Sequence, residues 1–164
     1  MRTNIPFMTS MSGSRFLPMI RELAQCFQAF ESYSAAHIRS LGLTPPQFDI
    51  IATLGNQRDM SCKELAEQTL ITKGTLTGVL DRLAAKGLLS RLPSPVDGRS
   101  WIVRLTAAGQ ALFEDVFPAH VAHLQPIFES YSDAELDALR TQFARLRHAF
   151  GENSPDNHQE ENHP

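Results

Sequence analysis

The sequence has few of the features that mark enzymes, secreted proteins or membrane proteins. Its 164 residues include only two cysteines, Cys26 and Cys62, which are too few for a disulfide framework or a cysteine-rich zinc site. No window approaches the roughly 18 apolar residues of a membrane-spanning helix, and residues 1–15 hold no apolar run of signal-peptide length. The motifs G-x-S-x-G, G-x-x-x-x-G-K-S/T and C-x-x-C do not occur. We therefore expect a cytoplasmic protein with reduced thiols and without enzymatic activity, cofactor, metal or membrane contact.

An overall excess of positive charge is also lacking, because the formal net charge is -3 at pH 7. The charge is unevenly distributed along the chain, however. Residues 72–104 hold six basic and two acidic side chains, whereas residues 105–164 hold three basic and ten acidic ones. A local positive field of this kind favours contact with nucleic acid through one face of the molecule.

The sequence is rich in helical periodicity. Apolar residues recur every three or four positions over residues 16–39, 45–55, 62–69, 73–86, the segment after residue 106, and 133–150. Three capping boxes predict helix starts, at Thr44, Ser61 and Ser132, and Thr72 and Thr106 are expected to cap two more helices. The interior prolines Pro118 and Pro126 predict that the helix after residue 106 bends or breaks. We expect residues 1–13 and 152–164 to form disordered tails.

Between the helices, one segment indicates a β-hairpin. Residues 87–92 lead into two prolines and an Asp-Gly-Arg tip, and residues 101–105 lead out with alternating apolar and polar side chains. The order helix, helix-turn-helix, hairpin and two helices is that of a winged helix-turn-helix. The expected fold class is mainly α with a small β-hairpin wing and with dimerisation helices at both ends.

These segments resemble the MarR family of bacterial transcriptional regulators. The resemblance rests on "LTPPQFDIIATL", "KELAEQTLITKGTLTGVLDRLAAKGLLSR" and "PVDGRSWIVRLTAAG". It implies a single domain over residues 14–151, with a DNA-binding lobe at about 44–106 and dimerisation helices at about 14–41 and 107–151. It also implies a homodimer on a pseudo-palindromic double-stranded DNA operator, with recognition helices in major grooves and wings in minor grooves.

The candidate DNA contacts follow from this resemblance and from the polar N-terminal half of the 73–86 helix. They are Ser61, Thr72, Lys73, Gly74, Thr75, Thr77, Arg82, Arg91, Asp97, Gly98, Arg99 and Ser100. Arg99 is expected to enter the minor groove, and the family suggests an Arg82–Asp97 ion pair that braces the wing. Gly74 and Gly78 depart from the larger side chains of many relatives, so base contacts should be sparse.

The family also implies a pocket for a small, perhaps aromatic, effector between the dimerisation helices and the DNA-binding lobe. The candidate lining residues are Phe30, Tyr33, His37, Phe48, Phe113 and Phe117. The aromatic residues are otherwise expected in the core. His120 and His123 lie on one helical face, but without a third ligand at a recognisable spacing we interpret them, with His37, as satisfied or exposed histidines rather than metal ligands. Cys26 is expected to be a buried, inert thiol.

The sequence thus predicts a dimeric, sequence-specific DNA-binding regulator, a repressor released by a small ligand. Two alternatives stay open. One is a thiol-based redox regulator of the same fold, for which Cys62 at a helix N-terminus is the better candidate thiolate. The other is a winged-helix module that binds a protein.

Overall fold

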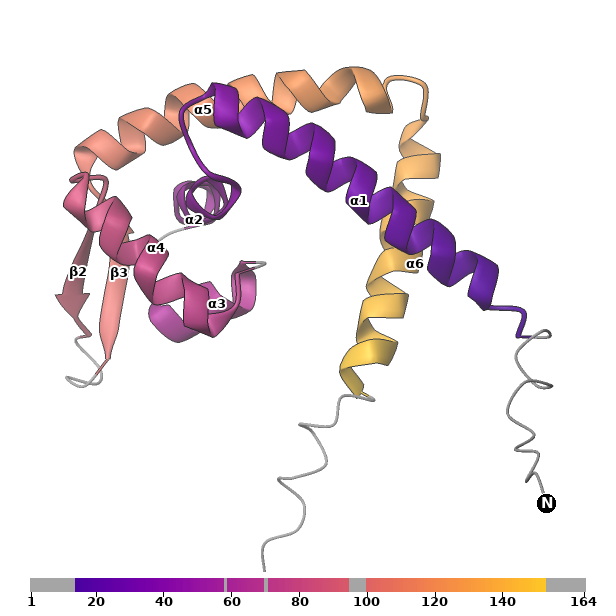
Figure 1. Cartoon of the computed structure of the whole chain (residues 1–164), viewed down its shortest axis with the longest axis horizontal. Coiled ribbons are helices and arrows are strands. Elements are labelled where there is room, and N and C mark those ends of the chain that lie inside the picture. The colour runs from indigo at the N-terminus through magenta and orange to yellow at the C-terminus, as the bar shows by residue number, and fades with distance from the viewer. Residues whose placement is uncertain (1–13, 58, 70, 95–99, 153–164) are drawn as a thin grey trace, which may run out of the picture. The chain divides into compact units, whose positions relative to one another are not determined.

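The computed structural model describes residues 14–57, 59–69, 71–94 and 100–152. Its elements in chain order are α1 (Leu17–Ser40), α2 (Pro45–Asn56), β1 (Met60–Ser61), α3 (Cys62–Gln68), α4 (Lys73–Ala85), β2 (Leu89–Pro93), β3 (Trp101–Leu105), α5 (Ala107–Phe128) and α6 (Asp133–Glu152) (Figure 1). The fold class is therefore mainly α with a small antiparallel sheet, as the sequence predicts. The expected N-terminal tail and residues 153–164 lie outside the described residues, while Glu152 ends α6.

The predicted capping boxes set the helix starts. Thr44 and Gln47 bond each other reciprocally at α2, and Ser61 and Glu64 do so at α3. At α6, the backbone N–H of Ser132 donates to Glu135 at 2.8 Å. Thr106 caps α5 as expected, because its hydroxyl accepts from the Gly109 backbone N–H at 3.1 Å. These bonds satisfy amide groups that a helix start leaves unpaired.

Two expectations about helices are met only in part. Thr72 occupies the N-cap position of α4 but makes no side-chain cap bond, because its hydroxyl donates to the Thr75 hydroxyl at 3.0 Å. Pro118 does not break α5, which is one continuous helix. Pro118 and Glu114, four residues before it, are both exposed, so water can bond the carbonyl that loses its helical partner.

The sheet has three strands in the order β1-β3-β2. The predicted hairpin is present, and β2 pairs antiparallel with β3 from Leu89↔Leu105 to Pro93↔Trp101. The sequence analysis missed β1, a two-residue strand that pairs Met60 with Val103. The sheet lies against one side of the helix-turn-helix, and the pairing of β1 with β3 joins the hairpin to the start of α3.

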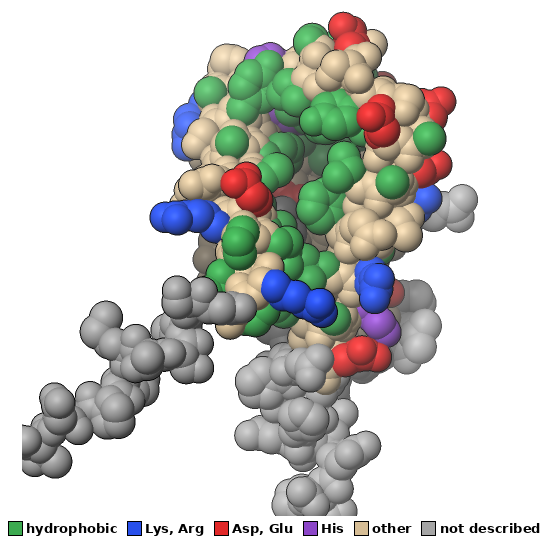
Figure 2. Space-filling model, turned by 90° about the vertical axis from the view of Figure 1, so that its right-hand side faces the viewer, with side chains coloured by type: hydrophobic (Ala, Val, Ile, Leu, Met, Phe, Trp, Pro, Cys, Tyr) green, Lys and Arg blue, Asp and Glu red, His purple; other side chains and the backbone are tan. Residues whose placement is uncertain are grey.

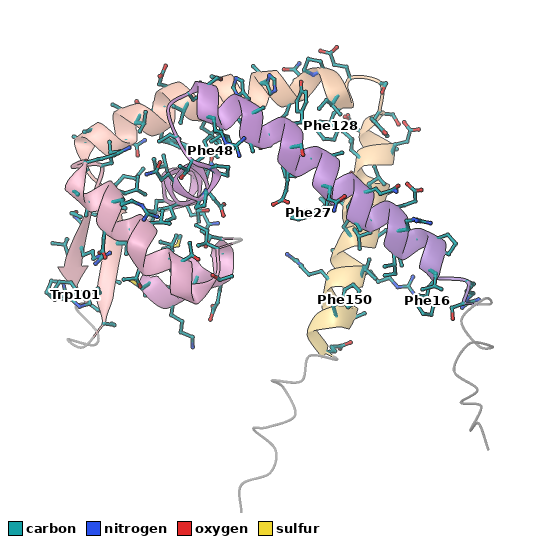
Figure 3. All side chains as sticks on the ribbon, in the orientation of Figure 1. Phe16, Phe27, Phe48, Trp101, Phe128 and Phe150 are labelled. Carbon is teal, nitrogen blue, oxygen red and sulfur yellow. The ribbon has the colours of Figure 1, made fainter. Side chains whose placement is uncertain are left out.

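The chain divides into two compact units, residues 1–123 and 124–164. The core of the first unit joins α2, α3 and α4 to the sheet, and Ile50, Ile51, Leu65, Leu83 and Val103 are fully buried there. The second unit consists of the end of α5 and α6, and α6 buries none of its residues. Large hydrophobic side chains remain exposed on α6, on α1 and at the N-cap of α1, including Phe150 at 57% and the N-cap residue Phe16 at 55% (Figures 2 and 3). No helix within the described ranges is long and apolar enough to cross a membrane.

Candidate nucleic-acid interface

The helix-turn-helix consists of α3, a short connection and α4. Hydrogen bonds from Ser61 lower the pKa of the Glu64 carboxyl, which keeps this cap ionised at the start of α3. The inner face of α4 is buried through Leu76, Val79, Leu80 and Leu83. This burial fixes which side of α4 faces outward.

The outward face of α4 is small and polar. Thr75 and Thr77 are exposed, and Gly74 is exposed with nothing within 4 Å of the position that a Cβ would take. The corresponding position at Gly78 meets only the Arg82 guanidinium, at 3.9 Å. Backbone and short hydroxyl side chains, rather than long side chains, thus form much of the surface that α4 offers to a partner.

An ion pair joins α4 to the hairpin. Arg91 on β2 donates to the Asp81 carboxylate on α4 at 2.7 Å, and the two side chains are 29% and 58% exposed. Arg91 also buries its Nε, which has no hydrogen-bond partner among the described residues. Arg91 was predicted as a DNA contact; in the structure its guanidinium joins the middle of β2 to α4. Arg104 on β3 makes a second bridge, to Asp59 at 3.0 Å.

The base of the hairpin, where β2 begins and β3 ends, is fastened to the start of α5. Thr106 donates its hydroxyl to the Gly87 carbonyl at 2.6 Å and its backbone N–H to the Leu88 carbonyl at 3.1 Å. A Cβ on Gly109 would overlap the Leu88 carbonyl, so only glycine permits this approach of α5 to the end of α4. Gly87 itself has a φ of +70°, a left-handed conformation that favours glycine.

Several predicted DNA contacts fall where the structure gives no placement. Asp97, Gly98 and Arg99 lie outside the described residues, so the expected Arg82–Asp97 pair stays a prediction. Lys73 begins α4, and its side chain is likewise outside the description. Ser100 is described, and its carbonyl accepts from the Ser94 backbone N–H at 2.8 Å across the hairpin.

A second cluster of side chains joins α1 to α5. The Nδ1 atoms of His37 and His120 lie 3.0 Å apart, and Ser34 bonds the other nitrogen of His120 at 3.1 Å. The ring of His123 stacks on His37 with centroids 4.0 Å apart, and Tyr33 stacks on the other side of His123 at 4.4 Å. Three histidines from two helices are thereby packed into one stack.

Burial is the main cause that lowers the pKa of both His37 and His120, and positive charge on the neighbouring histidines lowers it further. The geometry agrees with neutral rings. A bond between two Nδ1 atoms needs one donor and one acceptor, which two protonated imidazoles do not provide. His120 is the most enclosed, at 5% exposed.

The structure brings together part of the predicted effector set. Tyr33 and His37 meet in the histidine stack, and Phe48 of α2 contacts His120 edge-on with centroids 4.7 Å apart. Phe113 and Phe117 stack on each other along α5 at 5.1 Å. His120 and His123, which share one helical face, were predicted as satisfied or exposed histidines and not as part of the effector set, yet they join Tyr33 and His37 in the stack.

The expectation that the aromatic residues and Cys26 lie in the core is wrong for α1. Phe27, Phe30 and Tyr33 are 48%, 46% and 41% exposed, and Cys26 is exposed as well. The apolar stripe of α1 was predicted correctly, but among the described residues most of it has no covering partner. In the described ranges no group of three or more histidine, cysteine or acidic side chains is arranged to hold a metal ion.

Comparison with known proteins places these features in a family. The MarR family model matches residues 43–101. The multiple antibiotic resistance protein MarR of Escherichia coli is 30% identical over 106 residues, covering 65% of this chain and 74% of that protein.

Solved structures agree. NadR in complex with 4-hydroxyphenylacetate superimposes with a TM-score of 0.73 and 27% identity, covering 82% of this chain and 96% of NadR. A variant of E. coli MarR complexed with operator DNA gives a TM-score of 0.69 and 25% identity, covering 82% of this chain and 99% of that one. With its helix-turn-helix, its braced hairpin and these relatives, the chain belongs to the MarR family of transcriptional regulators.

Proposed function

We propose that this regulator is a homodimeric repressor that binds a pseudo-palindromic operator and is released by a small aromatic acid. The DNA-binding lobe comprises residues 44–106, and the helices of residues 14–41 and 107–151 form the dimer. The observation that carries the proposal is the small, polar face of α4, tied to the hairpin by the Asp81–Arg91 pair within the basic segment of the chain.

The arrangement of α4 and the hairpin suits two adjacent grooves. The exposed N-terminal half of α4, with Gly74, Thr75 and Thr77, lies on base edges and phosphates of the major groove. The hairpin then extends toward the neighbouring minor groove, where Arg99 contacts the duplex. The similar E. coli MarR variant in complex with operator DNA supports this assignment.

The exposed hydrophobic residues on α1 and α6 support the homodimer. Phe16, Phe143 and Phe150 are each more than half exposed, and soluble proteins rarely leave many such side chains in water. A second copy of the chain buries them, because a two-fold interface pairs each patch with its own equivalent.

The effector binds beside the histidine stack, with Tyr33, His37 and Phe48 among its contacts and with Phe30, Phe113 and Phe117 as further candidates. Aromatic rings offer stacking surfaces, and imidazole N–H groups donate to a carboxylate. The complex of NadR with 4-hydroxyphenylacetate supports an aromatic acid as the chemical class.

The DNA-binding proposal is tested by selecting duplexes from a random pool with the wild-type protein and measuring their binding by fluorescence anisotropy at several salt concentrations. We expect Arg99→Ala to bind much more weakly. Lys73→Ala should lower affinity and reduce the salt dependence by about one ion. Arg140→Gln is the control, because this α6 side chain is 79% exposed and pairs within its own helix. The proposal is contradicted if the wild-type protein selects no duplex, or if Arg99→Ala and Lys73→Ala both bind the duplex as well as the wild type.

Two further measurements test the dimer and the effector. Sedimentation should show a dimer at micromolar concentration, and a monomer would refute the assembly.

In a thermal-shift assay, 4-hydroxyphenylacetate at about 100 times its Kd should stabilise the protein by about 2.7 kcal/mol. His37→Phe should abolish this shift, while His148→Gln on α6, whose side chain is 76% exposed, should not. If 4-hydroxyphenylacetate raises the melting temperature of both variants equally, the histidine stack is not part of the effector site.

A further inference from the structure

The only tryptophan of the chain, Trp101, is exposed at the end of the hairpin that lies away from α5. It begins β3 and is 51% exposed, and Figure 3 shows it at this end of the hairpin, next to the undescribed residues 95–99. A single exposed apolar side chain needs no explanation by itself. The direction in which this one points is informative.

The strand register shows which side of the sheet carries Trp101. It pairs with Pro93, and the next pairs on the same face are Arg91↔Val103 and Leu89↔Leu105. Val103 is fully buried, and Arg91 on this face reaches Asp81 of α4. Trp101 therefore continues the α4-facing side of the sheet beyond the point where the core ends.

Resting on the proposed DNA binding, we propose that Trp101 contacts the DNA backbone that runs between the two occupied grooves. With α4 in the major groove and the end of the hairpin in the minor groove, the intervening DNA strand passes the α4-facing side of the hairpin beside Trp101. An indole suits that position, because its apolar face packs on deoxyribose and its N–H donates to a phosphate oxygen.

The charge around Trp101 favours DNA over a protein as the occupant. The basic segment of residues 72–104 surrounds it in sequence, and its face of the sheet is continuous with α4 through the Asp81–Arg91 pair. Leu92 offers a matched comparison, because it is 39% exposed on the opposite face, paired with Ile102. A contact with the strand between the grooves involves Trp101 and leaves Leu92 in water.

The test uses the full-length protein and the duplex that the wild-type protein selects. Since Trp101 is the sole tryptophan, its fluorescence reports this site alone, and DNA should protect it from quenching by acrylamide. Trp101→Ala should bind about five- to thirty-fold more weakly, equally for the selected duplex and its single-base variants. Trp101→Phe should recover most of the affinity, and Leu92→Ala should bind like wild type.

The salt dependence separates this contact from a charged one. An uncharged side chain neutralises no phosphate, so Trp101→Ala should keep the wild-type salt slope while Arg99→Ala reduces it by about one ion. If the wild-type protein binds DNA but its indole stays open to acrylamide and Trp101→Ala binds normally, the Trp101 contact is refuted and DNA binding stands. Equal losses in Trp101→Ala and Leu92→Ala, together with a lower melting temperature, would also refute it by showing a structural role. Failure of the wild-type protein to select any duplex would overturn both proposals.

Discussion

The two glycines of α4 should make the recognition helix less stable than its packing allows. Gly74 is the second residue of the helix and Gly78 lies in its middle. Neither has a positive φ, and a Cβ at either position would meet nothing closer than the Arg82 guanidinium at 3.9 Å. Alanine therefore fits at both positions in the free protein without moving a neighbour.

The expected gain follows from helix propensity. Alanine is favoured over glycine by about 0.8–1.0 kcal/mol in a helix interior, which applies fully to Gly78 and by roughly half to Gly74 near the helix end. The methyl groups make few new contacts through which the two sites could couple, so the gains should add. The double variant Gly74→Ala/Gly78→Ala should therefore gain about 1–1.5 kcal/mol in free energy of unfolding. For a chain of this size, the melting temperature should rise by about 2–6 °C.

The same change should weaken DNA binding. Positions four apart share one helical face, and here that face is open and formed largely by backbone. Two methyl groups would stand where the proposed interface lets the duplex approach α4 closely. We expect higher stability with lower affinity for the selected duplex, measured by thermal denaturation at equal protein concentration and by fluorescence anisotropy.

The matched control reverses the substitution. Ala84 is exposed near the C-terminal end of α4, so Ala84→Gly should lower the free energy of unfolding by up to about 1 kcal/mol and leave the N-terminal half of α4, which makes the proposed contact, unchanged. If the Gly74→Ala/Gly78→Ala variant melts at a lower temperature than the wild type, the steric reasoning is refuted. One that is more stable and binds DNA normally would show that α4 does not need its glycines for close approach.

Three further predictions concern the contacts that hold the first unit together. Because the folded-state pKa values of His37 and His120 lie below the ordinary 6.5, the unfolded chain binds more protons below that pH. The stability that these neutral histidines contribute should be fully retained above about pH 7 and decrease as the pH falls through 6.5. Urea denaturation from pH 7.5 to 5 measures this pH dependence of the free energy of unfolding. If the variant His37→Asn/His120→Asn keeps the same pH dependence as the wild type, the prediction is wrong. Gly109→Ala should lower the free energy of unfolding by about 1–3 kcal/mol or more, since its Cβ overlaps a backbone carbonyl, and a neutral result in urea denaturation would exclude that overlap. A double-mutant cycle with Asp81→Ala and Arg91→Ala should give a coupling energy of about 0–1 kcal/mol in stability but a larger coupling energy in DNA affinity. Purely additive losses of DNA affinity would show that the Asp81–Arg91 pair does not position the hairpin for DNA binding.

Local signals in the sequence predicted the helices well. Thr44, Ser61 and Ser132 each have a side-chain acceptor and a partner three residues later, so the capping bonds are decided within four residues. The hairpin followed from its turn residues and alternation in the same way. Strand β1 was missed because two residues carry no periodicity, and it exists only through its pairing with β3.

Interactions between distant segments were harder to predict. The ion pair between α4 and the hairpin uses Asp81 and Arg91, a pair that nothing in the local sequence indicates. The direction in which Asp81 points is set by the packing of α4, because adjacent helical residues point about a quarter-turn apart; the Arg82–Asp97 pair that the resemblance implies stays a prediction. His37 and His120 are separated by 83 residues, and nothing in either local sequence indicates that the two rings meet.

The arrangement of α5 explains how the two parts of the proposed function can communicate. Near its start, Gly109 lies against the backbone at the end of α4, and Thr106 bonds the same segment. Eleven residues later, about 16 Å along the helix, His120 bonds His37 of α1. A ligand that separates α1 from α5 at the histidine stack would act on the middle of the helix whose start contacts the base of the hairpin. Coupling through a rigid helix requires both attachments, so loosening the Gly109 junction should reduce the effect of an effector on DNA binding more than it reduces the affinity for the effector itself.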